Sequence, residues 1–269
     1  MLIPSSIITP RSGNLYLQGS VASCCADLDA TIAASYGGSG QTWANLIAAP
    51  ADSAAQSAYD FYLGATSGSS TDDPAFTGSP GSSAAYWACD GGDFFQIAAG
   101  NTTLLKDAHK TTGGGDVTMV MVFKSGSTLA NSPCFGNANA GASHGFDSLT
   151  ATTGTAFKMA QYNGTTGATT GTLETIAAST DYVVAVAFNY TSGTLKTALN
   201  ARVFTNRTIA SNVDTTDATN AFKIGGAGTG IIPTGYRIYS FSLFNALLSD
   251  ANLSSVIDAY NARHGRAYA

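Results

Sequence analysis

Short runs of strand-forming residues recur in this chain from Tyr86 to Phe244, and this recurrence restricts the fold more than any other feature. The runs are rich in Val, Ile, Tyr, Phe and Thr, and turn-forming pairs such as Asn163 with Gly164 separate them. We expect strands at 86–89, 94–98, 117–124, 156–162, 182–190, 195–205, 221–225 and 236–244. This arrangement is typical of an all-β sandwich or barrel.

Two of the expected strands are apolar almost without interruption. Residues 117–123 read VTMVMVF and residues 183–188 read VVAVAF. A strand with one face in water alternates apolar and polar residues, so a continuous apolar run indicates burial on both faces. We expect these two strands at the centre of the sandwich.

The last expected strand is followed by a short helix. In the strand, even-numbered residues 236–242 and odd-numbered residues 237–243 are expected to face opposite sides of the sheet. Ser249 is a good N-cap, Leu248 and Leu253 are placed to form a hydrophobic staple, and Gly265 is placed to end the helix. An apolar stripe at 253, 256, 257 and 260 predicts which face of the helix is buried.

Several motifs occur in the order found in one superfamily of sandwich proteins. They read L-D-A at 28–30, S-Y-G-G-S-G-Q-T-W-A-N-L at 35–46, W-A-C-D-G-G-D-F-F at 87–95, I-G-G at 224–226 and G-Y-R-I-Y-S-F-S-L-F-N at 235–245. Together they resemble the concanavalin A-like lectin/glucanase superfamily of laminin G and pentraxin type. The resemblance implies a two-sheet antiparallel jelly-roll sandwich. Because that fold hosts lectins, adhesion modules, enzymes and structural proteins, it does not fix a ligand.

The chain is expected to form one domain. Sandwiches of this length commonly do so, and no linker or fixed-period repeat divides the sequence. We assign 24–269 to the sandwich and 1–23 to an N-terminal arm or edge strand that offers an assembly contact.

The charge balance excludes two classes of partner. With 12 basic and 17 acidic residues the net charge is −5, which offers no basic footprint for nucleic acid or an anionic membrane. No run of about 18 apolar residues predicts a transmembrane helix. Charged residues make up only 11% of the chain, so Thr, Ser, Asn and Gly must supply the polar surface.

The cysteines and the first residues indicate where such a chain folds. Cys24, Cys25, Cys89 and Cys134 include no C-x-x-C pair, so we expect all four to be reduced. The first residues, MLIPSSIITPRSGNLYL, contain prolines where a secretion signal would need an apolar core, which predicts no export by this route.

The resemblance is to modules that usually work outside cells, yet we expect neither an export signal nor a disulfide framework. A virion protein made in the host cytoplasm satisfies both observations, and the charge-poor composition is similar to that of bacteriophage head-decoration, tail or fibre proteins of this fold. The leading hypothesis is therefore a non-enzymatic protein on the virion surface. Its expected partners are other virion proteins, host-surface polysaccharide and further copies of itself, by analogy in a trimer. The alternative is a secreted or cell-surface bacterial carbohydrate-binding or adhesion module.

A third alternative is a glucanase-type glycoside hydrolase. A retaining glycosidase needs two carboxyl groups about 5 Å apart, which these relatives place as two glutamates on one strand. The chain has a single glutamate, Glu174, so we expect no catalytic residues. The G-x-S-x-G match at 141–145 lacks the strand-to-helix context of a nucleophile elbow, and a turn serine is the ordinary interpretation.

Sugar binding needs an aromatic surface with polar groups beside it. Tyr59, Phe61 and Tyr62 form an aromatic cluster, and the Gly-, Ser- and Thr-rich stretch 64–84 that follows contains Asp72 and Asp73. We predict these five residues as the ligand-binding set. Trp43 and Trp87 lie within the superfamily-like motifs and are expected to be packing residues.

Ca²⁺ is the one cofactor that the sequence leaves open. Asp90, Asp93, Asn137 and Asn139 offer the hard oxygen ligands that Ca²⁺ prefers, although Asp90 and Asp93 also suit a tight turn. The histidines at 109, 144 and 264 are scattered without metal-ligand spacing, which predicts solvated or helix-end positions for them.

Overall fold

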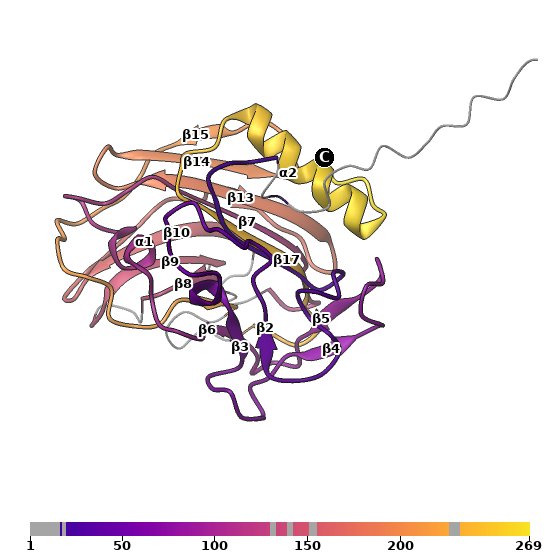
Figure 1. The fold of residues 1–269 in the computed structure, drawn as a ribbon. Helices are drawn as coiled ribbons and strands as arrows, with labels where there is room; N and C mark the ends of the chain where they lie inside the picture. The colour runs from indigo at the N-terminus through magenta and orange to yellow at the C-terminus, as the bar shows by residue number, and fades with distance from the viewer. Residues whose placement is uncertain (1–16, 18–19, 130–132, 139–141, 151–154, 226–231) are drawn as a thin grey trace, which may run out of the picture.

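The computed structural model describes residues 17, 20–129, 133–138, 142–150, 155–225 and 232–269. It consists of two antiparallel sheets, and it confirms the expected all-β sandwich with a short C-terminal helix (Figure 1). Within these residues, no helix is both long and apolar enough to cross a membrane.

The first sheet has β7, β13 and β17 at its centre. Its strands, in spatial order, are β15 (Thr205–Arg207), β14 (Thr194–Leu199), β13 (Asp181–Asn189), β7 (Val117–Lys124), β17 (Arg237–Phe244), β5 (Tyr86–Ala88) and β4 (Ala75–Thr77). A further strand, β1 (Cys24–Asp29), pairs with the second half of β17.

The second sheet carries most of the short strands. In spatial order they are β11 (Gly167–Thr169), β10 (Ala156–Asn163), β9 (His144–Thr150), β8 (Pro133–Gly136), β16 (Lys223–Ile224), β6 (Phe95–Ile97), β3 (Phe61–Leu63) and β2 (Thr42–Trp43). The strand β12 (Glu174–Thr175) pairs with β10. The described residues also include the 3₁₀ turn η2 (Gln56–Tyr59), α1 (Thr103–Asp107) and α2 (Asp250–His264).

The continuous apolar strands are buried on both faces, as predicted. In β7, Met119, Met121 and Phe123 belong to the core between the sheets, whereas Val120 and Val122 belong to a second core. That second core contains the apolar residues of α2, which covers the outer face of the first sheet (Figure 1). The predicted packing role of Trp43 and Trp87 is also confirmed, because both side chains are buried and their ring centroids lie 5.7 Å apart.

The helix α2 begins and ends where the sequence predicted. The Ser249 side chain accepts a hydrogen bond from the Asn252 N–H at 3.2 Å, and Gly265 adopts the left-handed conformation with φ 59°. Leu248 and Leu253 are both buried in the second core. Capping and staple therefore fix the helix over the sheet.

The predicted alternation along β17 is wrong at one position. The register with β7 shifts between Ile238 and Ser240, so Tyr239 is an extra residue in the strand. As a result Ile238 and Phe241 both belong to the core between the sheets, whereas Tyr239 belongs to the core under α2. A bulge of this kind reverses which parity faces inward.

A buried ionic cluster joins α2 to β1. The Arg263 guanidinium donates to both carboxylate oxygens of Asp27, at 2.9 and 2.6 Å, and to Asp29 at 3.2 Å. The His264 Nε2 lies 3.1 Å from Asp29, and all four side chains are buried. His264 is the last residue of α2, as the helix-end alternative predicted, but it is buried in this cluster and not solvated.

Of the predicted N-terminal arm, only 17 and 20–23 are described. Leu17 and Val21 are buried in the second core, beneath α2, so this part packs on the sandwich. Residues 1–16 and 18–19 lie outside the described residues.

Candidate functional site

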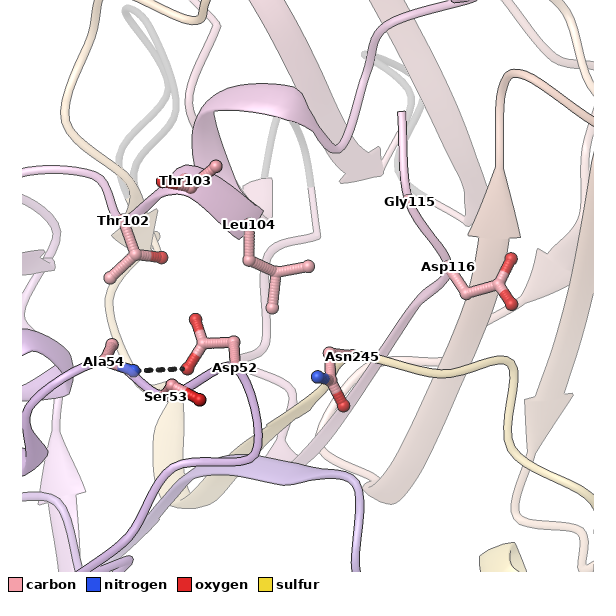
Figure 2. Close-up of a pocket in the computed structure, with 9 residues that line it drawn as sticks. All are labelled: Asp52, Ser53, Ala54, Thr102, Thr103, Leu104, Gly115, Asp116 and Asn245. Atoms are coloured by element: carbon pink, nitrogen blue, oxygen red, sulfur yellow. Dashed lines mark hydrogen bonds between the residues drawn. The ribbon is translucent and has the colours of Figure 1, made fainter. Parts of the chain in front are cut away.

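A hollow of about 480 Å³ opens where four distant segments meet (Figure 2). The segments are 52–54, 102–104, 115–116 and the residue that follows β17. Its lining residues are Asp52, Ser53, Ala54, Thr102, Thr103, Leu104, Gly115, Asp116 and Asn245.

Strand pairing explains why these segments meet. β7 and β17 run antiparallel with Thr118 opposite Phe244, so Asp116 before β7 and Asn245 after β17 lie at the same end of the first sheet. The start of α1 and the segment before η2 complete the hollow. The site therefore lies at a rim of the sandwich, where the ends of strands and the loops between them supply the side chains.

The buried Tyr59 contacts two of the lining side chains. Its hydroxyl hydrogen bonds to an Asp52 carboxylate oxygen and lies 3.0 Å from Thr102 Oγ1. The other Asp52 oxygen accepts from the Ala54 N–H at 3.2 Å. Burial, together with the hydrogen bond to Asp52, raises the pKa of Tyr59, so the phenol stays protonated and donates. Asp52 and Thr102 are consequently oriented before any ligand arrives.

The hollow combines one apolar side chain with several polar groups. Figure 2 shows Leu104 and the Asp52 carboxylate directed into the space between the segments, whereas the Asp116 carboxylate is directed away from it. Asp116 Oδ1 instead accepts a hydrogen bond from Asn189 at 2.7 Å. An apolar patch with hydroxyl, amide and carboxylate groups around it suits a ligand that carries many hydroxyl groups.

The predicted aromatic cluster does not form a sugar-binding surface. Tyr59 and Phe61 are 0% and 1% exposed, and Phe61 packs between the sheets. Only Tyr62, which faces the other side of β3, is partly exposed. A ring that is buried on both faces cannot stack on a sugar, so this prediction was wrong for Tyr59 and Phe61. The strand alternation, which places 61 and 63 inward, is the reason.

The aspartates of the predicted ligand-binding set, Asp72 and Asp73, lie near those of the predicted Ca²⁺ set, Asp90 and Asp93. A Cβ placed on Gly64 would lie 2.5 Å from Asp73 Oδ1 and 2.8 Å from Asp72 Oδ1. Burial, with smaller contributions from Asp90 and Asp73, raises the pKa of Asp93 to about 6. Asp93 Oδ2 accepts from the Asp90 N–H at 2.6 Å, which is the turn-forming role weighed against Ca²⁺ binding.

Asn137 lies apart from these aspartates. Both β6 and β8 pair antiparallel with β16, so they run in the same direction. Asp93 precedes β6 and Asn137 follows β8, which places them at opposite ends of the second sheet. Asn137 is buried, donates to the Leu105 carbonyl at 2.8 Å and accepts from the Phe146 N–H at 3.1 Å. Asp93 and Asn137 are therefore not brought into one Ca²⁺ site, and Asn139 lies outside the described residues.

Glu174, the single glutamate of the chain, is held by structural contacts. Glu174 Oε1 lies 2.6 Å from Arg207 Nη2 and accepts from Thr197 at 2.6 Å, on the edge strand β12. Ser143 lies in a turn that leads into β9, where a nucleophile elbow would require a helix.

No family model and no curated protein matches this chain. Solved structures match by fold. The Trypanosoma rangeli sialidase in complex with sialic acid aligns with a TM-score of 0.53 and 14% identity, over 90% of this chain and 33% of the sialidase chain. The receptor binding domain of botulinum neurotoxin D aligns with a TM-score of 0.54 and 10% identity, over 90% of this chain and 53% of the other. The chain thus spans about a third to a half of these proteins, and the likeness supports the jelly-roll sandwich fold.

Proposed function

We propose that this chain is a carbohydrate-binding sandwich domain without catalytic activity and that the rim hollow is its glycan site. The observation that carries the proposal is the preorganised group at the hollow: Leu104 directed inward, with Asp52 and Thr102 held by Tyr59. The fold shared with a sialidase and a receptor-binding domain supports a role in recognition.

The charges of the hollow favour a neutral glycan. Its lining includes Asp52 and Asp116 but no Lys or Arg, and the whole chain carries a net charge of −5. A sialic acid or uronic acid carboxylate would meet like charge without a cation to pair with it. We therefore expect neutral hexose or N-acetylhexosamine units to bind in preference to acidic sugars.

A glycan array carrying matched neutral and sialylated oligosaccharides tests this function. Calorimetric titration of the best neutral glycan then compares wild type with Asn245→Ala, which removes one amide from the hollow, and with Asn206→Ala, which removes an exposed amide from β15. A single hydrogen bond contributes about 1 kcal/mol, so Asn245→Ala is expected to weaken binding about fivefold and Asn206→Ala to leave it unchanged. Binding of sialylated glycans alone, or no binding, would contradict the proposal.

For the biological setting, we propose the surface of a bacteriophage particle, with the domain as a homo-oligomeric decoration or tail component. The support is the charge-poor composition together with the thiols. Cys24, Cys25 and Cys89 are free and buried, and burial raises the pKa of Cys25 to about 11, as suits folding in a reducing compartment. The side chain of Cys134 lies outside the described residues.

Two observations test this setting: light scattering on the full chain and on a form lacking 1–23, and the identity of the neighbouring genes. A trimer that is lost with the deletion, and a gene located beside capsid or tail genes, are the expected results. A monomer encoded beside secretion genes would favour the bacterial adhesion module.

A further inference from the structure

Two histidines and an aspartate that are far apart in the sequence converge on one point. His109 follows α1, His144 is the first residue of β9, and Asp214 lies in the connection between β15 and β16. His109 Nε2 lies 3.1 Å from Asp214 Oδ2, and His144 Nδ1 lies 3.0 Å from each Asp214 oxygen. One donor atom from each of the three residues lies within 4.8 Å of the other two.

This spacing is that of ligands around a small divalent cation. Zn²⁺ binds imidazole nitrogen at about 2.0–2.1 Å and carboxylate oxygen at about 2.0–2.2 Å, in tetrahedral geometry, so neighbouring ligand atoms lie about 3.3–3.5 Å apart. The observed separations of 3.0 and 3.1 Å need to open by only a few tenths of an ångström. Two nitrogen donors with one oxygen donor favour Zn²⁺ over Ca²⁺ or Mg²⁺, which prefer oxygen alone.

The backbone around the cluster is fixed by hydrogen bonds. The Asp214 N–H donates to Thr111 Oγ1 at 3.0 Å, and the Thr111 N–H donates to the Asp214 carbonyl at 2.9 Å. The Thr216 N–H donates to Asp214 Oδ1 at 2.9 Å, so this oxygen is oriented while Oδ2 faces His109.

The buried side chain of Gln161 adds a second clamp. It donates to the His109 carbonyl at 3.2 Å and to the Asn212 carbonyl at 3.0 Å, and it accepts from the Asn212 N–H at 2.7 Å. Such outer contacts are what orient metal ligands in proteins.

His109 is the observation that points to a ligand. Its side chain is 0% exposed, Nδ1 has no hydrogen-bond partner among the described residues, and Nε2 lies 3.1 Å from Asp214 Oδ2 without the geometry of a hydrogen bond. A buried imidazole with so few polar contacts is costly, and such a group requires an explanation. Coordination of a cation by Nε2, with Asp214 as a second ligand, accounts for the placement of that nitrogen. His144 is 26% exposed on its side chain, which gives the cluster access to solvent.

We propose that His109 Nε2, His144 Nδ1 and Asp214 Oδ2 form a Zn²⁺ site that fastens the segment after α1 to β9 and to the connection before β16. The site has three protein ligands, and the fourth position faces solvent on the side of His144. It is separate from the glycan hollow, with which it shares no residue, so neither proposal depends on the other.

Calorimetric titration of the chelator-treated full chain with Zn²⁺ alone tests the site. We expect one Zn²⁺ per chain, with affinity lowered at least tenfold in His144→Ala and in Asp214→Asn. Asp217→Asn is the matched control, because it removes an exposed carboxylate three residues away that pairs with Lys110, and it is expected to bind Zn²⁺ as wild type does.

X-ray absorption on the Zn²⁺-loaded wild type gives a second readout that needs no variant. It is expected to show two imidazole ligands with oxygen completing the shell. Absence of stoichiometric binding, unchanged affinity in a folded His144→Ala, or a shell without imidazole would each overturn the proposal.

Discussion

Replacing Arg263 by alanine is expected to destabilise the domain severely. The guanidinium makes three hydrogen bonds of 2.6–3.2 Å to Asp27 and Asp29, and the side chains of all three residues are 0% exposed. Its removal leaves both carboxylates buried, with His264 Nε2 still 3.1 Å from Asp29. Removing one partner of a buried ion pair costs about 3–5 kcal/mol, which is a large fraction of the stability of an ordinary domain.

Equilibrium urea unfolding, followed by tryptophan fluorescence, measures the loss. Arg266→Ala is the matched control, because Arg266 pairs with Asp181 at 2.9 Å with both side chains about a third exposed or more, and such a pair contributes about 0–1 kcal/mol. The free energy of unfolding is expected to fall by at least about 2 kcal/mol more in Arg263→Ala than in Arg266→Ala. Equal losses in the two variants would refute the argument that burial makes this cluster important.

Three further changes have defined outcomes. Tyr59→Phe keeps the ring but removes the hydroxyl that orients the hollow, so glycan affinity measured by calorimetry should fall several-fold with a stability loss of about 0.5–1.5 kcal/mol; unchanged affinity would argue against positioning by Tyr59. The pKa of Asp93 is about 6 in the folded chain against 3.8 ordinarily, so its carboxylate lowers stability above about pH 6 and this penalty disappears as the pH falls towards 4. Asp93→Asn should therefore stabilise the chain by up to about 3 kcal/mol at pH 8 but hardly at pH 4, and thermal unfolding at both pH values would reveal an equal effect if this were wrong. Ser249→Ala removes the α2 cap and should cost about 1 kcal/mol in urea unfolding, whereas Ser254→Ala, later in the same helix, should cost much less.

The elements that the sequence predicted best are those in which local pattern and tertiary position agree. The continuous apolar run at 117–124 is β7, with the predicted bounds, because α2 covers the face that would otherwise need polar residues. The cap at Ser249 and the stop at Gly265 are set by neighbouring backbone, so they can be read locally.

The elements that sequence reasoning missed depend on partners far along the chain. The bulge in β17 is a shift in its register with β7, in a strand that also pairs with β1 and β5, and no residue in 236–244 marks it. The expected strand 195–205 is two strands, because Asn200 has a left-handed φ of 45° and ends β14. The Gly-, Ser- and Thr-rich stretch 64–84, for which no strand was expected, contains β4, which is stabilised by pairing with β5.

The candidate sites could not have been found from spacing. The hollow gathers side chains from 52 to 245, and Tyr59 was predicted as a contact surface although its ring is buried beneath the hollow. His144 and Asp214 are 70 residues apart, so the histidines look scattered until β9 and the connection before β16 are placed beside each other. The only local signal was composition: polar residues at strand ends, where loops meet at a rim.

Nitrogen–proton correlation spectra of the full chain, recorded during titration with the best-bound neutral oligosaccharide, test the central claim most directly. The account predicts that saturable shifts concentrate on backbone amides of 52–54, 102–104, 115–116 and Asn245. Shifts concentrated elsewhere, such as at 64–73 around Asp72 and Asp73, or no shifts at saturating glycan, would contradict the assignment of the rim hollow as the glycan site.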